Sequence, residues 1–274
     1  MLVTIATSLA VVLILGTESF AFFKEVSLID FLFGTRWEPL LEPKSFGVLP
    51  LVSGTGLIVV GSILIALPAG LFVAVYLNEY ANYRIRQIVK PALELLAGIP
   101  TVVYGYFALT FITPLMKSVF PQVQVFNAFS GAVVVGIMIL PMVSSLVDDA
   151  FRGVPKSLRE GAYAMGANPV EVTTQIILPA IKSRIAAAII LAVSRAVGET
   201  MAVTLAAGAT AKMTLNPFES IQTMTAYIVQ VSLGDTPHGG IEYQTCFAVA
   251  ALLFVMTFTM NIIGNRFMFN EKRS

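Results

Sequence analysis

The chain has very few of the side chains that most often carry out chemistry in proteins. It contains one cysteine, Cys246, and one histidine, His238, in 274 residues. One cysteine cannot form an internal disulfide or a redox pair, and one histidine cannot build a histidine-based metal cluster. Little is left from which an enzyme could assemble a metal triad, a Ser-His-Asp set or a thiol pair.

Charge is scarce as well. Only 12% of the residues are charged, whereas a soluble domain carries about 25%, and 57% are hydrophobic. The formal net charge of +1 gives no reason to expect a nucleic acid, which would call for a concentrated basic face. No lysine follows a glycine, so the nucleotide-binding P-loop pattern cannot occur. Water is therefore not the main solvent of this chain.

What the chain does have is long apolar runs. A hydrocarbon core of about 30 Å requires about 20 apolar residues in a helix. Six runs of roughly that size or longer recur along the chain: residues 1–17, 46–78, 95–116, 118–147, 185–211 and 243–265. They predict an all-α membrane protein with six transmembrane helices and a single domain over residues 1–274. The first run could instead be a signal peptide, but it lacks a basic start and a convincing cleavage site.

Basic residues predict the orientation, because lysine and arginine in short loops resist translocation to the outside. If the N-terminus is cytoplasmic, eleven of the 17 basic residues lie in inner segments, five lie in outer segments, and Arg195 lies within a span. This bias favours both termini on the cytoplasmic side.

Two outer segments have their own structural signals. Residues 27–33 are typical of a short amphipathic helix, and Trp37 then suggests an aromatic anchor at the membrane interface. In the outer loop 207–243, Asn216 and Glu219 form a capping-box pattern that predicts a helix on the outer membrane surface, with Gly234 as its stop. The apolar positions of this helix share one face: Ile221, Met224, Ile228 and Val231.

The cytoplasmic segment 154–179 is too polar to cross a bilayer and predicts a helix, a tight turn and a second helix. Pro155 is suited to a helix start and Gly166 to a helix stop. The second helix begins with a further capping pattern, formed by Asn168, Pro169 and Glu171. Two acidic residues precede this segment, and Asp148 and Asp149 are interpreted as solvated charges at a helix end.

The same segment resembles the EAA loop of ABC-importer permeases. The matching positions, at the spacing of that motif, are Glu160, Gly161, Ala162, Gly166, Ile176, Leu178 and Pro179. Gly161 departs from the expected alanine, which costs a helix about 1 kcal/mol. In that family the loop docks into a cleft of the ATPase subunit. The alternative is a loop helix that only covers helix ends.

An Arg-Glu pair lies within the predicted span 185–211. One charged residue there costs roughly 2.5 to 3.5 kcal/mol, and Arg195 and Glu199 are four positions apart on one helix face. Arg195 could offer paired donors to an oxyanion such as phosphate. Glu199 could hold the guanidinium and accept a hydrogen bond from protonated phosphate, which sulfate cannot donate near neutral pH. The alternative is a self-neutralising pair that bridges spans without touching a substrate.

Three further stretches are similar to the PstC family, one of two permease subunits of bacterial phosphate ABC importers: residues 97–106, 194–201 and 219–238. The resemblance implies a type I ABC importer permease fold in the bacterial inner membrane, working by alternating access. It implies a heterodimer with PstA, two PstB ATPase subunits that use ATP and Mg²⁺, and the phosphate receptor PstS. The chain itself would bind no cofactor. The intramembrane Arg and Glu of the family match Arg195 and Glu199.

Other functions remain as alternatives. A permease for sulfate or molybdate would share the EAA loop, and only the outer stretch and the Arg195–Glu199 pair argue against it. A secondary transporter would more often show inverted repeats, and the sequence has no detectable repeat. A membrane enzyme is the weakest alternative, because its chemical groups are missing.

Overall fold

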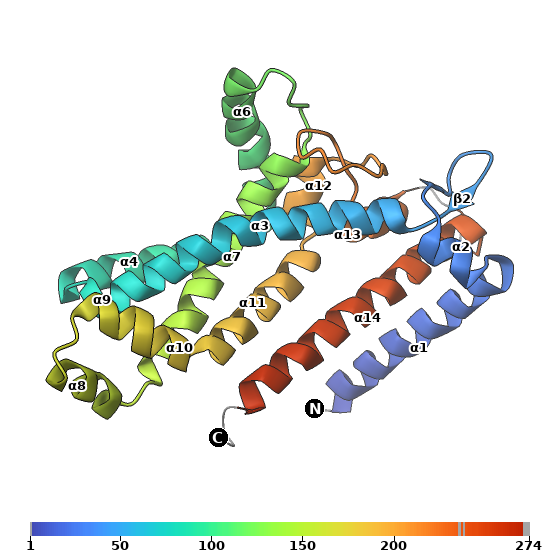
Figure 1. Ribbon diagram of the computed structural model, residues 1–274. Helices are drawn as coiled ribbons and strands as arrows, with labels where there is room; N and C mark the ends of the chain where they lie inside the picture. Colours follow the sequence, from blue (N-terminus) through green and yellow to red (C-terminus); the bar gives the residue numbers. More distant parts are fainter. Residues whose placement is uncertain (1, 235–236, 238, 271–274) are drawn as a thin grey trace.

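The computed structural model describes residues 2–234, 237 and 239–270, and most of them are helical (Figure 1). The stretch 219–238, which resembles the PstC family, includes residues 235, 236 and 238, and these three lie outside the described residues. The first part of the chain forms α1 (Leu2–Glu25), α2 (Leu28–Phe33), the antiparallel strands β1 (Trp37–Glu38) and β2 (Ser45–Phe46), α3 (Leu49–Val75) and the π-helix η1 (Tyr76–Tyr80). The middle forms α4 (Tyr83–Gly98), α5 (Thr101–Phe107), η2 (Ala108–Ile112), α6 (Thr113–Val119), α7 (Ala128–Arg152) and α8 (Lys156–Ala164). The last part forms α9 (Pro169–Glu171), η3 (Val172–Ile177), α10 (Leu178–Ala180), α11 (Lys182–Val197), α12 (Met201–Ala207), α13 (Met224–Leu233) and α14 (Ile241–Asn270).

The prediction of a helical membrane protein is confirmed, and the predicted number of six passes agrees with the five or six that the structure supports. Within the described residues, five helical segments are long and apolar enough to span a bilayer. A sixth pass is reached if Lys182–Val197 is counted together with Pro169–Ala180, from which it is bent by 68° at Ile181. The start of α1, the end of α14 and the helix α8 lie toward the same end of the molecule (Figure 1).

The predicted third, fourth and fifth spans have different bounds in the structure. Pro100 disfavours helical backbone at Ile99, so the third pass begins at Thr101, and residues 95–98 instead end the separate helix α4. The fourth begins only at Ala128, where the Asn127 side chain accepts a hydrogen bond from the Ser130 backbone N–H at 2.8 Å.

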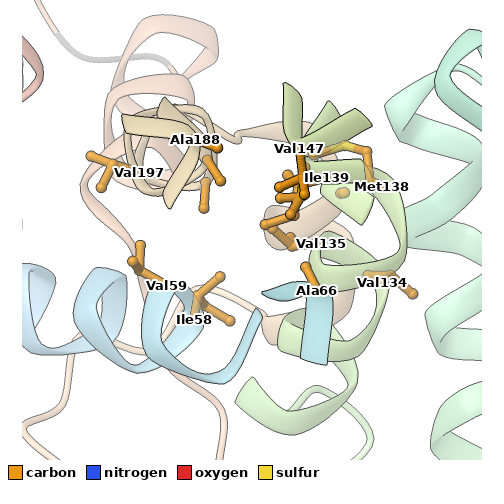
Figure 2. Packing of buried hydrophobic residues seen from close by; sticks show 14 of the residues in the cluster. Ile58, Val59, Ala66, Val134, Val135, Met138, Ile139, Val147, Ala188 and Val197 are labelled. Atoms are coloured by element: carbon orange, nitrogen blue, oxygen red, sulfur yellow. The ribbon is translucent and has the colours of Figure 1, made fainter. Parts of the chain in front are cut away.

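Close packing of α3 against α7 forms the centre of the fold. A Cβ atom added at Gly61 would lie 2.7 Å from Cβ of Ala132, and one added at Gly70 would lie 2.8 Å from Cγ1 of Val143. Lipid tails are as apolar as these side chains, so close backbone approach holds such helices together. Buried residues of α11 complete this core, including Ala188 (Figure 2).

A second apolar cluster lies where α1, α2, α13 and α14 meet, and it corrects two predictions. Trp37 is only 3% exposed and packs edge-on against Tyr227 at 4.9 Å, so it is a core residue and not an interfacial anchor. The outer helix starts at Met224, capped by Thr223, whereas Asn216 forms only a turn that ends at Glu219. The helix α13 is moreover buried against α14 and α3, because Tyr227 bonds Thr245 and the Met224 N–H donates to Thr55 Oγ1 at 3.1 Å.

Candidate functional site

A cavity of about 370 Å³ lies between α4, α7 and α11, with η1 at one end. Its wall is mostly apolar, with a few polar groups placed among residues such as Met138 and Leu93. The polar groups are Lys90, Glu94, Ser144, Ser145, Asp148 and Arg195. A mostly apolar pocket with a few convergent polar groups is the usual form of a small-ligand site.

Arg195 and Glu199 form the predicted ion pair, with Nη1 and Oε2 3.1 Å apart. The Glu199 side chain is 3% exposed and the Arg195 side chain 45% exposed, so the carboxylate is buried behind a guanidinium that lines the cavity. Nη2 of Arg195 also lies 3.9 Å from Sδ of Met138 on α7. The geometry leaves part of the guanidinium accessible from the cavity.

The two residues do not lie on one continuous helix, which corrects the predicted span 185–211. The helix α11 ends at Val197, and α12 begins at Met201. Glu199 lies in the break, where its Oε1 accepts a hydrogen bond from the Ala202 N–H at 3.3 Å. Its backbone carbonyl accepts one from Thr225 Oγ1 at 2.7 Å, which links the break to α13. Glu199 thus connects the cavity to α13.

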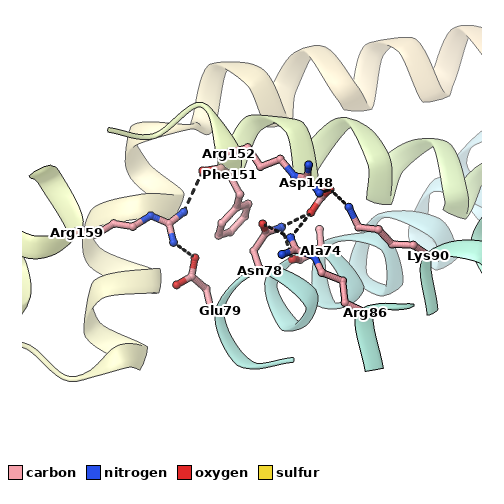
Figure 3. Close-up of polar contacts among 9 residues, drawn as sticks. All are labelled: Ala74, Asn78, Glu79, Arg86, Lys90, Asp148, Phe151, Arg152 and Arg159. Carbon is pink, nitrogen blue, oxygen red and sulfur yellow. Dashed lines mark hydrogen bonds and ion pairs between the residues drawn. The ribbon is translucent and has the colours of Figure 1, made fainter. Parts of the chain in front are cut away.

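Asp148 is not a solvated helix-end charge, and this prediction was wrong. The residue is 6% exposed and lies at the centre of a polar cluster that joins η1, α4 and α7 (Figure 3). Its Oδ2 lies 2.6 Å from Lys90 Nζ and 3.0 Å from Arg152 Nη2. Its Oδ1 accepts from Asn78 Nδ2 at 2.6 Å and lies 3.5 Å from Arg86 Nη2. Asp149, in contrast, is exposed as expected.

The segment 154–179 folds as the predicted helix, turn and helix. Gly166 has φ +87°, and the Ala167 N–H donates to Ala162 O at 3.2 Å, which is the pattern of a Schellman stop after α8. The capping box is present, because Asn168 Oδ1 accepts from the Glu171 N–H at 3.0 Å and Glu171 Oε2 from the Asn168 N–H at 2.8 Å.

The EAA positions are distributed over both helices of this segment. Glu160, Gly161, Gly166 and Pro179 are exposed, and Ala162, Ile176 and Leu178 are partly buried. One further contact fixes the segment to the membrane helices: Arg159 on α8 pairs with Glu79 and donates to Phe151 O at 3.0 Å (Figure 3). The EAA residues and the Arg195–Glu199 pair form two separate groups. The Asp148 cluster lies between them, because Asp148 lines the cavity and its neighbour η1 contacts α8 through the Arg159–Glu79 pair.

Sequence reasoning missed Lys90, Asn78 and Glu79. Lys90 counted only as a basic loop residue, and the other two lie in η1 at the end of an apolar run. A π-helical turn is frequent at functional sites, but the residue types of η1 do not predict one.

Comparison with known proteins decides the family. Residues 66–269 match the family of binding-protein-dependent transport system inner membrane components. The chain belongs to this family. It is a permease subunit of a type I ABC importer and not an enzyme. Such a permease is a multi-pass membrane protein that works with an ATPase and a substrate-binding protein.

Among the relatives of this permease subunit, YqgH of Bacillus subtilis, named a probable ABC transporter permease, is 34% identical over 94% of this chain and 84% of its own length. A phosphate transport system permease protein PstC of Mesorhizobium japonicum is 32% identical over 95% of this chain and 86% of its own. A bacterial alginate ABC transporter structure shares the fold with a TM-score of 0.63 at 16% identity, over 96% of this chain and 93% of that one. The inward-facing MetNI methionine transporter has a TM-score of 0.58 at 18% identity, over 82% and 94%.

Proposed function

We propose that this permease subunit moves inorganic phosphate across the bacterial inner membrane by alternating access. The observation that carries the proposal is the Arg195 guanidinium, 45% exposed on a largely apolar cavity wall with the buried Glu199 carboxylate behind it. A guanidinium presents planar, paired donors that suit a tetrahedral oxyanion. Relatives named phosphate transport system permease protein PstC, such as that of Mesorhizobium japonicum, support phosphate as the oxyanion.

Glu199 has two roles in this proposal. Its charge partly neutralises Arg195, so that an anion binds without being trapped. Its carboxylate also accepts a hydrogen bond from the hydroxyl of protonated phosphate, whereas sulfate near neutral pH has no proton to donate. Glu199 is only 3% exposed, so in this conformation little of its carboxylate is open to a substrate.

The partners follow from the same proposal. The permease pairs with a PstA subunit, and two PstB subunits bind ATP and Mg²⁺ and hydrolyse the nucleotide. A PstS receptor delivers phosphate from outside. The PstB cleft receives the segment 154–179, through the positions Glu160, Gly161, Ala162, Gly166, Ile176, Leu178 and Pro179. Both termini and α8 then lie in the cytoplasm, and the loop 207–243 faces outward. This agrees with Figure 1, in which the start of α1, the end of α14 and α8 lie toward one end of the molecule and α12 and the segment that follows it toward the other.

The test is radiolabelled phosphate uptake into proteoliposomes that hold the whole importer, with the receptor outside and the ATPase supplied with ATP. Arg195→Gln is compared with Arg84→Gln, which removes a positive charge from an exposed position outside the cavity. We expect Arg195→Gln to hydrolyse ATP without phosphate uptake and Arg84→Gln to transport normally. Equal transport by both variants would assign the Arg195–Glu199 pair a purely structural role.

The main alternative is a permease for sulfate or molybdate. The assay distinguishes it, because each labelled oxyanion is offered with the same vesicles and unlabelled phosphate as competitor. Uptake of sulfate or molybdate that phosphate does not inhibit would overturn phosphate as the substrate, but Arg195 would keep its role in oxyanion binding.

A further inference from the structure

Lys90 and Asp148 repeat the arrangement of Arg195 and Glu199 at a second place in the same cavity. In both pairs the carboxylate is buried, with 9% of the Asp148 and 3% of the Glu199 side chain exposed. In both the cation lines the cavity and stays accessible, with 32% of the Lys90 and 45% of the Arg195 side chain exposed. Lys90 and Asp148 come from the separate helices α4 and α7, whereas Arg195 belongs to α11 and Glu199 to the break that follows it.

The Asp148 cluster carries more positive than negative charge. Three cations, Arg86, Lys90 and Arg152, lie within 3.5 Å of one carboxylate, whose oxygens also accept from Asn78. The buried Nε of Arg86 has no acceptor among the residues that the structure describes. Of the three cations, Lys90 is the one that lines the cavity, so an anion that entered it would meet a hydrogen-bond donor already held in place by Asp148.

The two cationic groups follow one another along α7. Arg195 contacts Met138 and Lys90 contacts Asp148, and these two α7 residues are ten positions apart. At 1.5 Å per residue, that spacing corresponds to about 15 Å along the helix. The second group lies toward η1 and the contact of α8 with Glu79. Ser144 and Ser145 add hydroxyl groups to the wall between them.

We propose that Lys90, held by Asp148, is a second binding site for the transported oxyanion, between Arg195 and the end of the cavity near α8. The inference rests on the proposed function and deepens it. Two weak sites in series let an anion leave the first without entering an unfavourable apolar passage, the same principle by which ion pathways combine binding with release. Glu94 lines the same cavity and opposes anion binding there by its charge.

The Lys90 variant is expected to fold. If Lys90 becomes glutamine, Asp148 keeps Asn78, Arg86 and Arg152 as partners, so no buried carboxylate is left unpaired. Lys90→Arg keeps the positive charge and should retain most of the binding. Arg84→Gln on the same helix removes an equal charge outside the cavity and is the matched control.

The experiment measures equilibrium binding of radiolabelled inorganic phosphate to the purified complete importer without receptor, for wild type and each variant. A hydrogen bond to a charged group contributes about 1.5 to 3 kcal/mol, so Lys90→Gln should weaken binding about tenfold or more. Glu94→Gln should strengthen it, and Arg84→Gln should leave it unchanged. Opposite shifts for Lys90 and Glu94 support the site, because a general loss of structure would weaken binding in both.

Equal binding by all variants, or weakening by both Lys90→Gln and Glu94→Gln, would overturn the second site. The absence of measurable binding to wild type at millimolar anion would overturn it as well. If the importer carries phosphate but the variants bind alike, the second site fails and the proposed function stands. If it carries sulfate instead and sulfate binding shows the opposite shifts, the substrate fails and the second site stands.

Discussion

Arg159 on α8 forms an ion pair with Glu79, the residue that follows Asn78 in η1. Asn78 in turn donates to Asp148, which holds Lys90 at the cavity wall. The segment that resembles the EAA loop is thus connected to the cavity by a short series of polar contacts through one π-helical turn (Figure 3). Such a rigid contact could carry a partner's movement into the membrane helices.

The Arg159–Glu79 pair should be needed for coupling. Its side chains are 23% and 7% exposed, so Arg159→Glu leaves Glu79 facing a like charge with little solvent. We expect a loss of about 3 kcal/mol in stability, at the lower end for a broken buried pair. Importers in proteoliposomes should still hydrolyse ATP but transport less substrate per ATP.

The charge-reversed pair, Arg159→Glu with Glu79→Arg, provides the control. A double-mutant cycle isolates the interaction between the two positions. Partial recovery of both stability and transport per ATP is expected in the double variant. A double variant as defective as the sum of the two single variants would show that the pair does not connect α8 to η1.

In the segment 154–179, replacement of two glycines by alanine should change the stability in opposite directions. Gly166 has φ +87°, where a side chain costs about 1 to 2 kcal/mol, although no atom lies within 4 Å of an added Cβ. Gly161 also has no atom within 4 Å but lies inside α8, where alanine is favoured by about 1 kcal/mol. Thermal unfolding of the purified importer should therefore shift down for Gly166→Ala and up for Gly161→Ala. Equal shifts would mean that backbone conformation does not control this loop.

Features set by short stretches of sequence could be predicted. The membrane passes follow from apolar length, because a bilayer requires about 20 such residues in a helix. The turn at Gly166 and the capping box at Asn168 follow from conformational preferences and hydrogen bonds within a few residues. Arg195 and Glu199 pair because they are four positions apart, even though the helix breaks between them.

Features that depend on distant segments could not be predicted. Asp148 looks the same in sequence whether water or Lys90 surrounds it, and its partners on α4 and η1 lie 58 and 70 positions away. Trp37 likewise suits a membrane interface as well as a core, and only its packing against Tyr227 decides between them. The pairing of Lys90 with Asp148 at the cavity wall could not be predicted for this reason.

The loop that carries Glu219 should lose order in acid. Glu219 accepts hydrogen bonds from Lys212 Nζ at 2.7 Å and Asn216 Nδ2 at 3.3 Å, and the bond from Lys212 is the main reason that the pKa of its carboxyl lies below the ordinary value. A lowered folded-state pKa means that the stabilisation is complete above the unfolded pKa of about 4.3 and is lost as the pH falls through the folded pKa. Hydrogen exchange of residues 212–222, corrected for its intrinsic pH dependence, should therefore rise in that acidic range. Lys212→Gln should show faster exchange already at neutral pH, and a variant that exchanges like wild type throughout would contradict the prediction.

Glu199→Gln should change selectivity more than transport. Glutamine keeps an oxygen that can accept from the Ala202 N–H, so the start of α12 should survive. It removes the negative charge beside Arg195 and replaces one acceptor oxygen with an amide donor, which a fully ionised oxyanion can use as well as phosphate can. Sulfate should therefore compete about tenfold better for uptake by the variant, a change of about 1.4 kcal/mol in discrimination. Glu199→Asp keeps the charge and serves as the control. Unchanged phosphate uptake together with unchanged sulfate rejection in Glu199→Gln would show that Glu199 only positions Arg195. Its contact with Arg195 at 3.1 Å and its hydrogen bonds to α12 and α13 would then account for that positioning role.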